Sequence, residues 1–126
     1  MNKDELVHEI GAMLLDDRKI QSRRPWEHLA MVVQFMTGST KVNGFVYRGG
    51  GAAVPTSPGN FEVMKKFREL REAMQEPGKE PWKAALVRID DASKRISIDF
   101  EYDHPEKWMI DPGTVQQMAE TLRPPG

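Results

Sequence analysis

Cysteine is missing from all 126 residues of the sequence. Its absence excludes disulfide bonds, thiolate nucleophiles and cysteine-based zinc sites, and it fits a reducing compartment. The three histidines, His8, His28 and His104, are far apart in the chain and belong to no HExxH or Ser-His-Asp pattern. The sequence therefore offers no ready set of residues for nucleophilic or metal-assisted catalysis.

Excess positive charge and long apolar runs are also missing. The chain carries 18 Lys and Arg against 19 Asp and Glu, whereas proteins that bind nucleic acid phosphates normally show a basic excess. No apolar run approaches the ~20 residues that span a bilayer. Acids at Asp4 and Glu5 occupy a region that is basic or apolar in targeting peptides. We therefore expect a cytoplasmic protein that binds neither nucleic acid nor a membrane.

The glycine run at residues 49–51 is the one segment that suggests a phosphate-binding loop. It is followed by Ala52, Ala53, Val54 and Pro55, and so lacks the Lys-Ser/Thr pair of a Walker loop and the spaced glycines of a dinucleotide fingerprint. Residues 48–59 are therefore predicted to form a flexible loop, and no cofactor is expected.

The length of the chain suits a single domain spanning residues 1–126. Its first element is predicted to be a helix capped by Asn2, with Glu5 in capping-box position. This helix presents one apolar stripe, formed by Leu6, Ile10, Met13 and Leu14. Residues 18–25, which follow it, are polar and basic and are predicted to form a loop.

A β-hairpin is predicted next. Residues 26–36 and 42–47 are rich in apolar and β-branched side chains, and a short turn containing Gly38 separates them. A helix over residues 26–36 competes with this interpretation, but the turn and the β-branched content favour a strand. A second helix is predicted from Ser57, as cap, and Pro58 to the break at residues 77–78. Its buried stripe is Val63, Phe67, Leu70 and Met74.

The second half of the chain predicts another hairpin and a last helix. Residues 82–90 are apolar on both sides, which indicates an inner strand, whereas residues 96–102 alternate strictly between apolar and polar. We expect Ile98 and Phe100 to lie in the core beneath Phe67 and Leu70. A helix capped by Asp111 is predicted over residues 112–122. The fold class is therefore α+β in the order α-β-β-α-β-β-α, with a four-stranded antiparallel sheet made of two hairpins and helices packed on one face.

The polar side of the last strand carries Asp99 and Glu101, and Asp103 continues the alternation. Alternate strand residues are roughly 6.6 Å apart, so these carboxylates are expected to form a row. The row is typical of a solvated strand face, but it also suits a binding surface, an oxygen-rich metal site or paired acids of a glycosidase. From residue 89 onward eight acids stand against four bases, which favours attraction of a basic partner.

Trp26, Trp82 and Trp108 are large side chains for a domain of this size. Core packing is the ordinary role of tryptophan, and anchoring of an interface is the alternative. Trp108 lies in the polar stretch Glu106-Lys107-Trp108, so it is the tryptophan that we assign to an interface. Together with Asp99, Glu101 and Asp103 it forms the predicted partner-binding set.

Two segments carry a resemblance to a known family. Glu80-Pro81-Trp82 follows an amphipathic helix, and residues 96–103 read Ile-Ser-Ile-Asp-Phe-Glu-Tyr-Asp. This arrangement resembles the YezG-like immunity proteins. The resemblance covers most of the chain, and its specific part is residues 61–108, whereas the glycine-rich loop at residues 48–59 departs from it.

The resemblance implies a non-catalytic antitoxin that binds a cognate bacterial toxin, often one with an LXG export domain and a C-terminal nuclease. A basic nuclease domain is accordingly the expected partner, and the resemblance implies no catalytic or metal-binding residues. The alternative function is a small metal-dependent hydrolase that uses Asp99, Glu101 and Asp103. A structural subunit of a larger assembly is a third possibility.

Overall fold

A computed structural model describes residues 2–124 of the chain. The elements are α1 (Lys3–Asp16), α2 (Arg18–Gln21), β1 (His28–Met36), β2 (Ser39–Tyr47), β3 (Ala53–Thr56), α3 (Glu62–Met74), β4 (Ala84–Asp90), β5 (Arg95–Glu101) and α4 (Val115–Thr121). The α+β class and the antiparallel sheet are confirmed. The predicted strand number and element order are wrong, because β3 and α2 occupy segments that were predicted to be loops.

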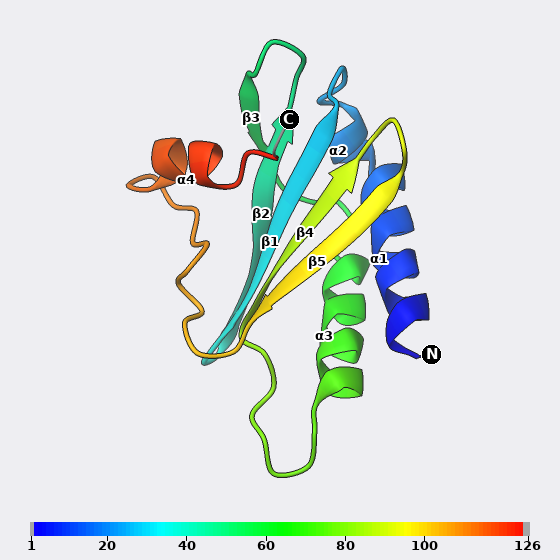
Figure 1. Cartoon of the computed structure of the whole chain (residues 1–126), viewed down its shortest axis with the longest axis vertical. Helices are drawn as coiled ribbons and strands as arrows, with labels where there is room; N and C mark the ends of the chain where they lie inside the picture. The colour runs from blue at the N-terminus through cyan, green and yellow to red at the C-terminus, as the bar shows by residue number, and fades with distance from the viewer. Residues whose placement is uncertain (1, 125–126) are drawn as a thin grey trace.

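The sheet has five strands in the order β3-β2-β1-β4-β5, and every neighbouring pair is antiparallel. The two predicted hairpins, β1–β2 and β4–β5, are both present and meet along the pair β1–β4 (Figure 1). Residues 28–36 form a strand and not the competing helix. β4 lies between β1 and β5, as its two apolar sides predict.

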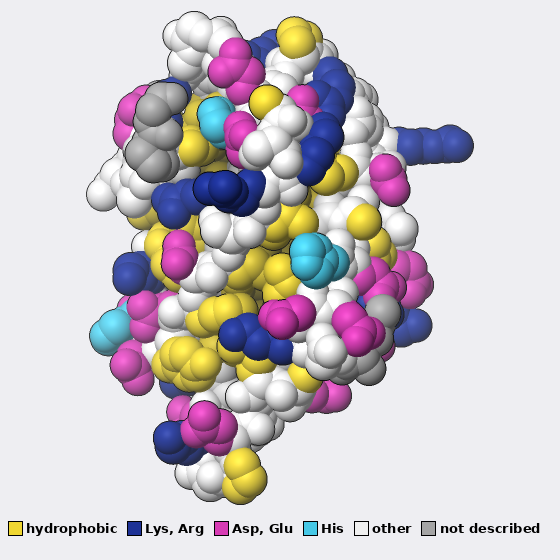
Figure 2. Space-filling model, turned by 45° about the vertical axis from the view of Figure 1, so that its right-hand side comes forward, with side chains coloured by type: hydrophobic (Ala, Val, Ile, Leu, Met, Phe, Trp, Pro, Cys, Tyr) yellow, Lys and Arg dark blue, Asp and Glu magenta, His cyan; other side chains and the backbone are white. Residues whose placement is uncertain are grey.

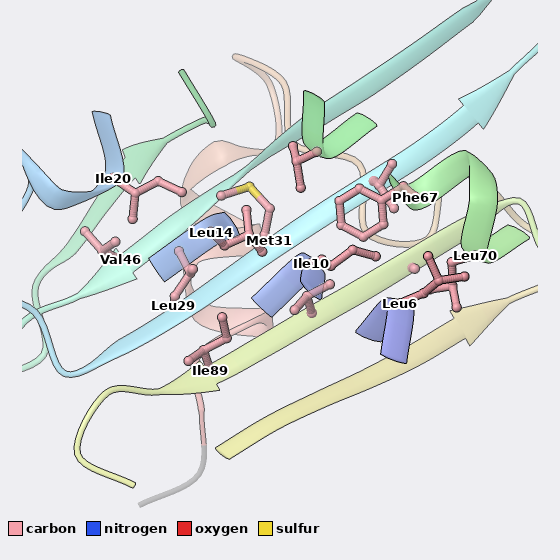
Figure 3. Close-up of a cluster of buried hydrophobic side chains, with 14 of the residues drawn as sticks. Leu6, Ile10, Leu14, Ile20, Leu29, Met31, Val46, Phe67, Leu70 and Ile89 are labelled. Carbon is pink, nitrogen blue, oxygen red and sulfur yellow. The ribbon is translucent and has the colours of Figure 1, made fainter. Parts of the chain in front are cut away.

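The first face of the sheet is covered by α1 and α3, which pack against each other (Figure 1). Most of the predicted stripe of each helix is buried there, whereas Met13 and Met74 are partly buried, and Figure 3 shows Leu6 of α1 beside Leu70 of α3. Ile98 and Phe100 were expected in the core; they pack against this cluster but are only partly buried, because β5 lies at the edge of the sheet. Asn2 caps α1 as predicted, because its Oδ1 accepts a hydrogen bond from the Glu5 amide at 2.9 Å.

The second face of the sheet is also covered, which corrects the prediction that all helices pack on one face. A separate buried cluster contains Ala30, Val32, Phe45, Tyr47, Ala84, Leu86, Trp108, Ile110 and Leu122. Its cover is the irregular segment that follows β5, together with α4. Inner strands with apolar side chains on both faces require such a cover, because exposing the second face would leave a large apolar surface in water.

Two helices begin later than predicted. α3 begins at Glu62, because Asn60 accepts the Glu62 amide at 3.0 Å and the predicted Ser57 cap is not used. α4 begins at Val115, since Asp111 instead accepts the amides of Gly113 and Thr114 in a turn that precedes the helix. Among the described residues, no helix is both long and apolar enough to span a membrane.

Candidate partner-binding surface

Strand β5 lies at one edge of the sheet and pairs only with β4 among the strands of residues 2–124. An edge strand presents a row of backbone N–H and C=O groups that another strand can bind. The opposite edge is β3, which is four residues long and contains Pro55. Proline has no N–H to donate, so β3 is the poorer of the two edges for strand addition. β5 is therefore the edge best suited to a partner.

The apolar side of β5 rests on α1. A β-carbon at Gly11 of α1 would overlap the Cδ1 atom of Ile96, so glycine at this position allows the helix to approach the strand closely. Phe100 lies 5.4 Å from the Trp82 ring, measured between centroids. Figure 2 brings the side of the molecule with β5 and α1 forward and shows a band of hydrophobic side chains bordered by charged ones. Helix packing thus holds β5 in place while part of its apolar side reaches the surface.

Asp99 is the most accessible strand carboxylate of the predicted set. Its side chain is 63% exposed, and its Oδ2 lies 3.5 Å from Nη1 of Arg88 on the neighbouring strand β4. An ion pair at this exposure contributes little to stability, on the order of 0–1 kcal/mol. Asp99 can therefore exchange Arg88 for a cation of a partner at small cost.

Glu101 has a different environment, and only 14% of its side chain is exposed. Its Oε2 accepts the backbone amides of Asp103 at 3.0 Å and His104 at 3.2 Å, and Oε1 lies 3.4 Å from Lys107 Nζ. The amide hydrogen bonds from Asp103 and His104, followed by Lys107, hold the pKa of Glu101 below its usual value. Glu101 therefore stabilises the turn after β5, and the predicted row of three free carboxylates is interrupted.

Asp103 lies beyond the end of β5, next to Tyr102, which is 46% exposed. Both residues line a hollow of about 420 Å³. Tyrosine combines a large apolar area with a polar tip, which makes it a frequent anchor of protein interfaces. The sequence prediction did not include Tyr102, although it continues the apolar side of the alternating strand. The remaining residues of the hollow are Met74, Glu76, Lys79 and Glu80.

Trp108 faces the sheet and is 8% exposed, in the second buried cluster. Lys107 lies over its ring, with Nζ 5.2 Å from the centroid. Its polar sequence neighbours suggested an exposed anchor, but they flank a side chain that points inward and completes the cover of the second face. Trp108 therefore offers no exposed side chain to a partner, and its packing supports the segment that follows β5.

Within residues 2–124, no group of three or more His, Asp or Glu side chains is placed to hold a metal ion. The glycine run forms the turn between β2 and β3, where Gly50 and Gly51 adopt positive φ angles of 85° and 95°. Only glycine adopts such angles without strain. The run is thus explained by hairpin geometry, which corrects the prediction of a flexible loop.

The candidate surface therefore consists of the β5 edge with Asp99, Tyr102 and Asp103. Glu101 stabilises the turn after β5, and Trp108 packs the segment that follows it. Comparison with known proteins adds no relative to this picture: no family model matches the chain, and no curated protein matches it either.

Proposed function

We propose that this chain is a non-catalytic protein-binding module that captures its partner along β5. The observation that carries the proposal is the free edge of β5 combined with an exposed carboxylate, Asp99, and an exposed aromatic residue, Tyr102. A partner strand added to the edge gains main-chain hydrogen bonds, while side chains beside the edge select its sequence.

The partner that this surface suits is basic. Asp99 and Asp103 flank the free edge, and the chain from residue 89 onward carries about -4 of charge against about +3 for the remainder. Charge complementarity raises the association rate and discriminates against partners of like charge. Tyr102 supplies the apolar contact that charge alone does not provide.

The resemblance to YezG-like immunity proteins makes the proposal more specific. The partner is then a toxin whose nuclease domain has a basic groove for phosphates, and binding of the acidic edge obstructs that groove. One of the two segments that carry the resemblance, residues 96–103, also provides most of the proposed surface. This coincidence supports the immunity function over an unrelated binding function.

Co-expression with the product of the adjacent gene tests the proposal. A tagged neighbour should co-purify with this chain, and the triple variant Asp99→Asn, Tyr102→Ala, Asp103→Asn should abolish co-purification. The matched control is Asp16→Asn with Glu72→Gln, which alters two exposed acids on α1 and α3 and none on β5. Equal co-purification of the triple variant and the wild type would contradict the proposed surface.

A further inference from the structure

A second hollow, of about 850 Å³, lies between the β1–β2 turn and α3. Its charged side chains are Arg68, Arg71 and Lys83, and no carboxylate is among its lining residues. This composition is the reverse of the acidic surface at β5. The rest of the lining is Phe35, Met36, residues 37–40, Met64 and Pro105.

Arg71 is the best-positioned cation of this hollow. Its guanidinium group lies 4.8 Å from the centroid of the Phe35 ring, and its Nε donates a hydrogen bond to the Trp82 carbonyl at 2.6 Å. These two contacts fix the plane of the guanidinium. The terminal Nη groups donate no hydrogen bond within residues 2–124, so two donors of a fork suited to a carboxylate stay available.

The charge of Arg71 is partly desolvated and has no ion-pair partner among the described residues. Burial lowers its pKa, and no nearby carboxylate counteracts this effect. A cation removed from water normally has an ion-pair partner, because the loss of hydration is otherwise unfavourable. Arg68 precedes Arg71 by three residues on α3, and it too has no ion pair among the described residues. Lys83 lies 3.5 Å from the exposed Glu80 and completes the group.

The hollow is also apolar. Phe35, Met36 and Met64 contribute to its lining, and the flexible methionine side chains adapt to ligands of different shape. Phe61, the N-cap residue of α3, is 74% exposed and precedes Met64 by three residues, but it does not line the hollow. A free inorganic anion would use the cations but would gain nothing from this apolar surface.

We propose that this hollow binds an acidic peptide segment of a partner protein, in which a carboxylate lies next to an apolar side chain. The carboxylate pairs with Arg68 and Arg71, and the apolar side chain contacts Phe35 and Met64. This site is independent of the proposed function at β5, because its residues and its charge preference are different.

Selection of peptides from a displayed random library on the immobilised full chain tests this inference. Enriched peptides should combine Asp or Glu with a neighbouring large apolar residue. Arg68→Gln should weaken binding of the selected peptides by at least tenfold, and Arg71→Lys, which retains charge but loses the fork, should weaken it as well. Lys65→Gln is the control, since Lys65 lies on the same helix, pairs with Glu62 and is outside the hollow.

Thermal melting of each variant separates loss of binding from loss of fold. Arg68→Gln should disturb packing least, because Arg68 is exposed. Competition experiments complete the test, with inorganic phosphate and with glutamate-containing peptides that lack apolar residues as competitors. If phosphate displaced a bound selected peptide as effectively as another selected peptide does, the hollow would be a simple anion site and the proposal would be overturned. The absence of any enriched acidic peptide, or equal binding to Arg68→Gln, would also overturn it. The triple variant Asp99→Asn, Tyr102→Ala, Asp103→Asn, which alters the β5 surface, should bind the selected peptides as well as the wild type does.

Discussion

The backbone amide of Gly59 donates to both carboxylate oxygens of Asp17, at 3.0 and 2.9 Å. The same carboxylate accepts the amides of Lys19 and Ile20, which begin α2, and the amide of Asn60. One buried side chain thereby joins the end of α1, the start of α2 and the approach to α3. The approach to α3 at Gly59 is 42 residues from Asp17 in sequence.

Replacement of Asp17 should therefore destabilise the domain. Asp17→Ala removes a helix cap and the side-chain acceptor of the Gly59 and Asn60 amides, and we expect a loss of about 2–3 kcal/mol in the free energy of unfolding. Urea denaturation followed by circular dichroism measures the change. Asp16→Asn is the matched control because its side chain is exposed, and it should cost less than about 0.5 kcal/mol. Similar losses in both variants would contradict the assigned role.

The pH dependence of stability should also depend on Asp17. Burial raises the pKa of Asp17, but hydrogen bonds from the amides of Gly59, Asn60, Ile20 and Lys19 together outweigh burial and lower it below 3.8. A lowered pKa in the folded state means stability that is present above pH 4 and is lost as the pH falls through the folded value. The difference in melting temperature between wild type and Asp17→Asn should shrink from pH 6 to pH 2.5. A constant difference over that range would contradict this linkage.

Tyr47 should hold α4 against the sheet. Its hydroxyl group donates to the Ala119 carbonyl at 2.8 Å, and burial raises its pKa to about 12. Tyr47→Phe should reduce stability by about 1 kcal/mol and accelerate hydrogen exchange in α4. In a Tyr102→Phe background, ultraviolet titration should report one phenol with a midpoint near 12. Because the folded state retains this proton more strongly, stability should decrease as the pH rises from 10 to 12.

Phe100 should contribute to the core through its contact with Trp82. Full burial of a phenylalanine would make Phe100→Ala cost roughly 3–5 kcal/mol. Phe100 is half-buried at the sheet edge, so we expect a smaller cost, about 2–3 kcal/mol. Chemical denaturation provides the measurement. Ser97→Ala, on the exposed opposite side of β5, is the control, and a cost for Phe100→Ala as small as that of Ser97→Ala would mean that the ring does not pack as described.

The elements with regular side-chain periodicity were predictable from the sequence. The alternation in β5 and the stripes of α1 and α3 each mark one buried face, and the two apolar sides of β4 mark an inner strand. β3 was not predicted, because Pro55 and the nearby glycines are typical of loops. An edge strand nevertheless tolerates proline. The cover of the second face was also not predicted, because Trp108 and Ile110 lie in an irregular segment without helical or strand spacing.

The candidate site was predictable only in part, because sequence periodicity does not show which side chains take part in local hydrogen bonds. Sequence alternation places carboxylates on one side of a strand, but it does not reveal which of them accept local backbone amides. Asp99 remains exposed, whereas Glu101 is occupied by the turn at Asp103 and His104. Trp108 illustrates the same limit, since polar neighbours in sequence do not determine where an aromatic side chain points in an irregular segment.

The kinetics of partner binding should separate the roles of the residues at β5. Asp99→Asn with Asp103→Asn should slow association and flatten its dependence on ionic strength, because exposed charges act mainly on encounter. Tyr102→Ala should instead raise the dissociation rate about tenfold, which corresponds to ~1.4 kcal/mol. Surface plasmon resonance against the product of the adjacent gene, at several salt concentrations, measures the association and dissociation rates. Trp108→Ala should instead lower the melting temperature, since Trp108 lies in the second buried cluster and its loss leaves a cavity. Unchanged association of the double carboxylate variant at low salt would exclude this edge as the interface, and the immunity function would then depend on the sequence resemblance alone.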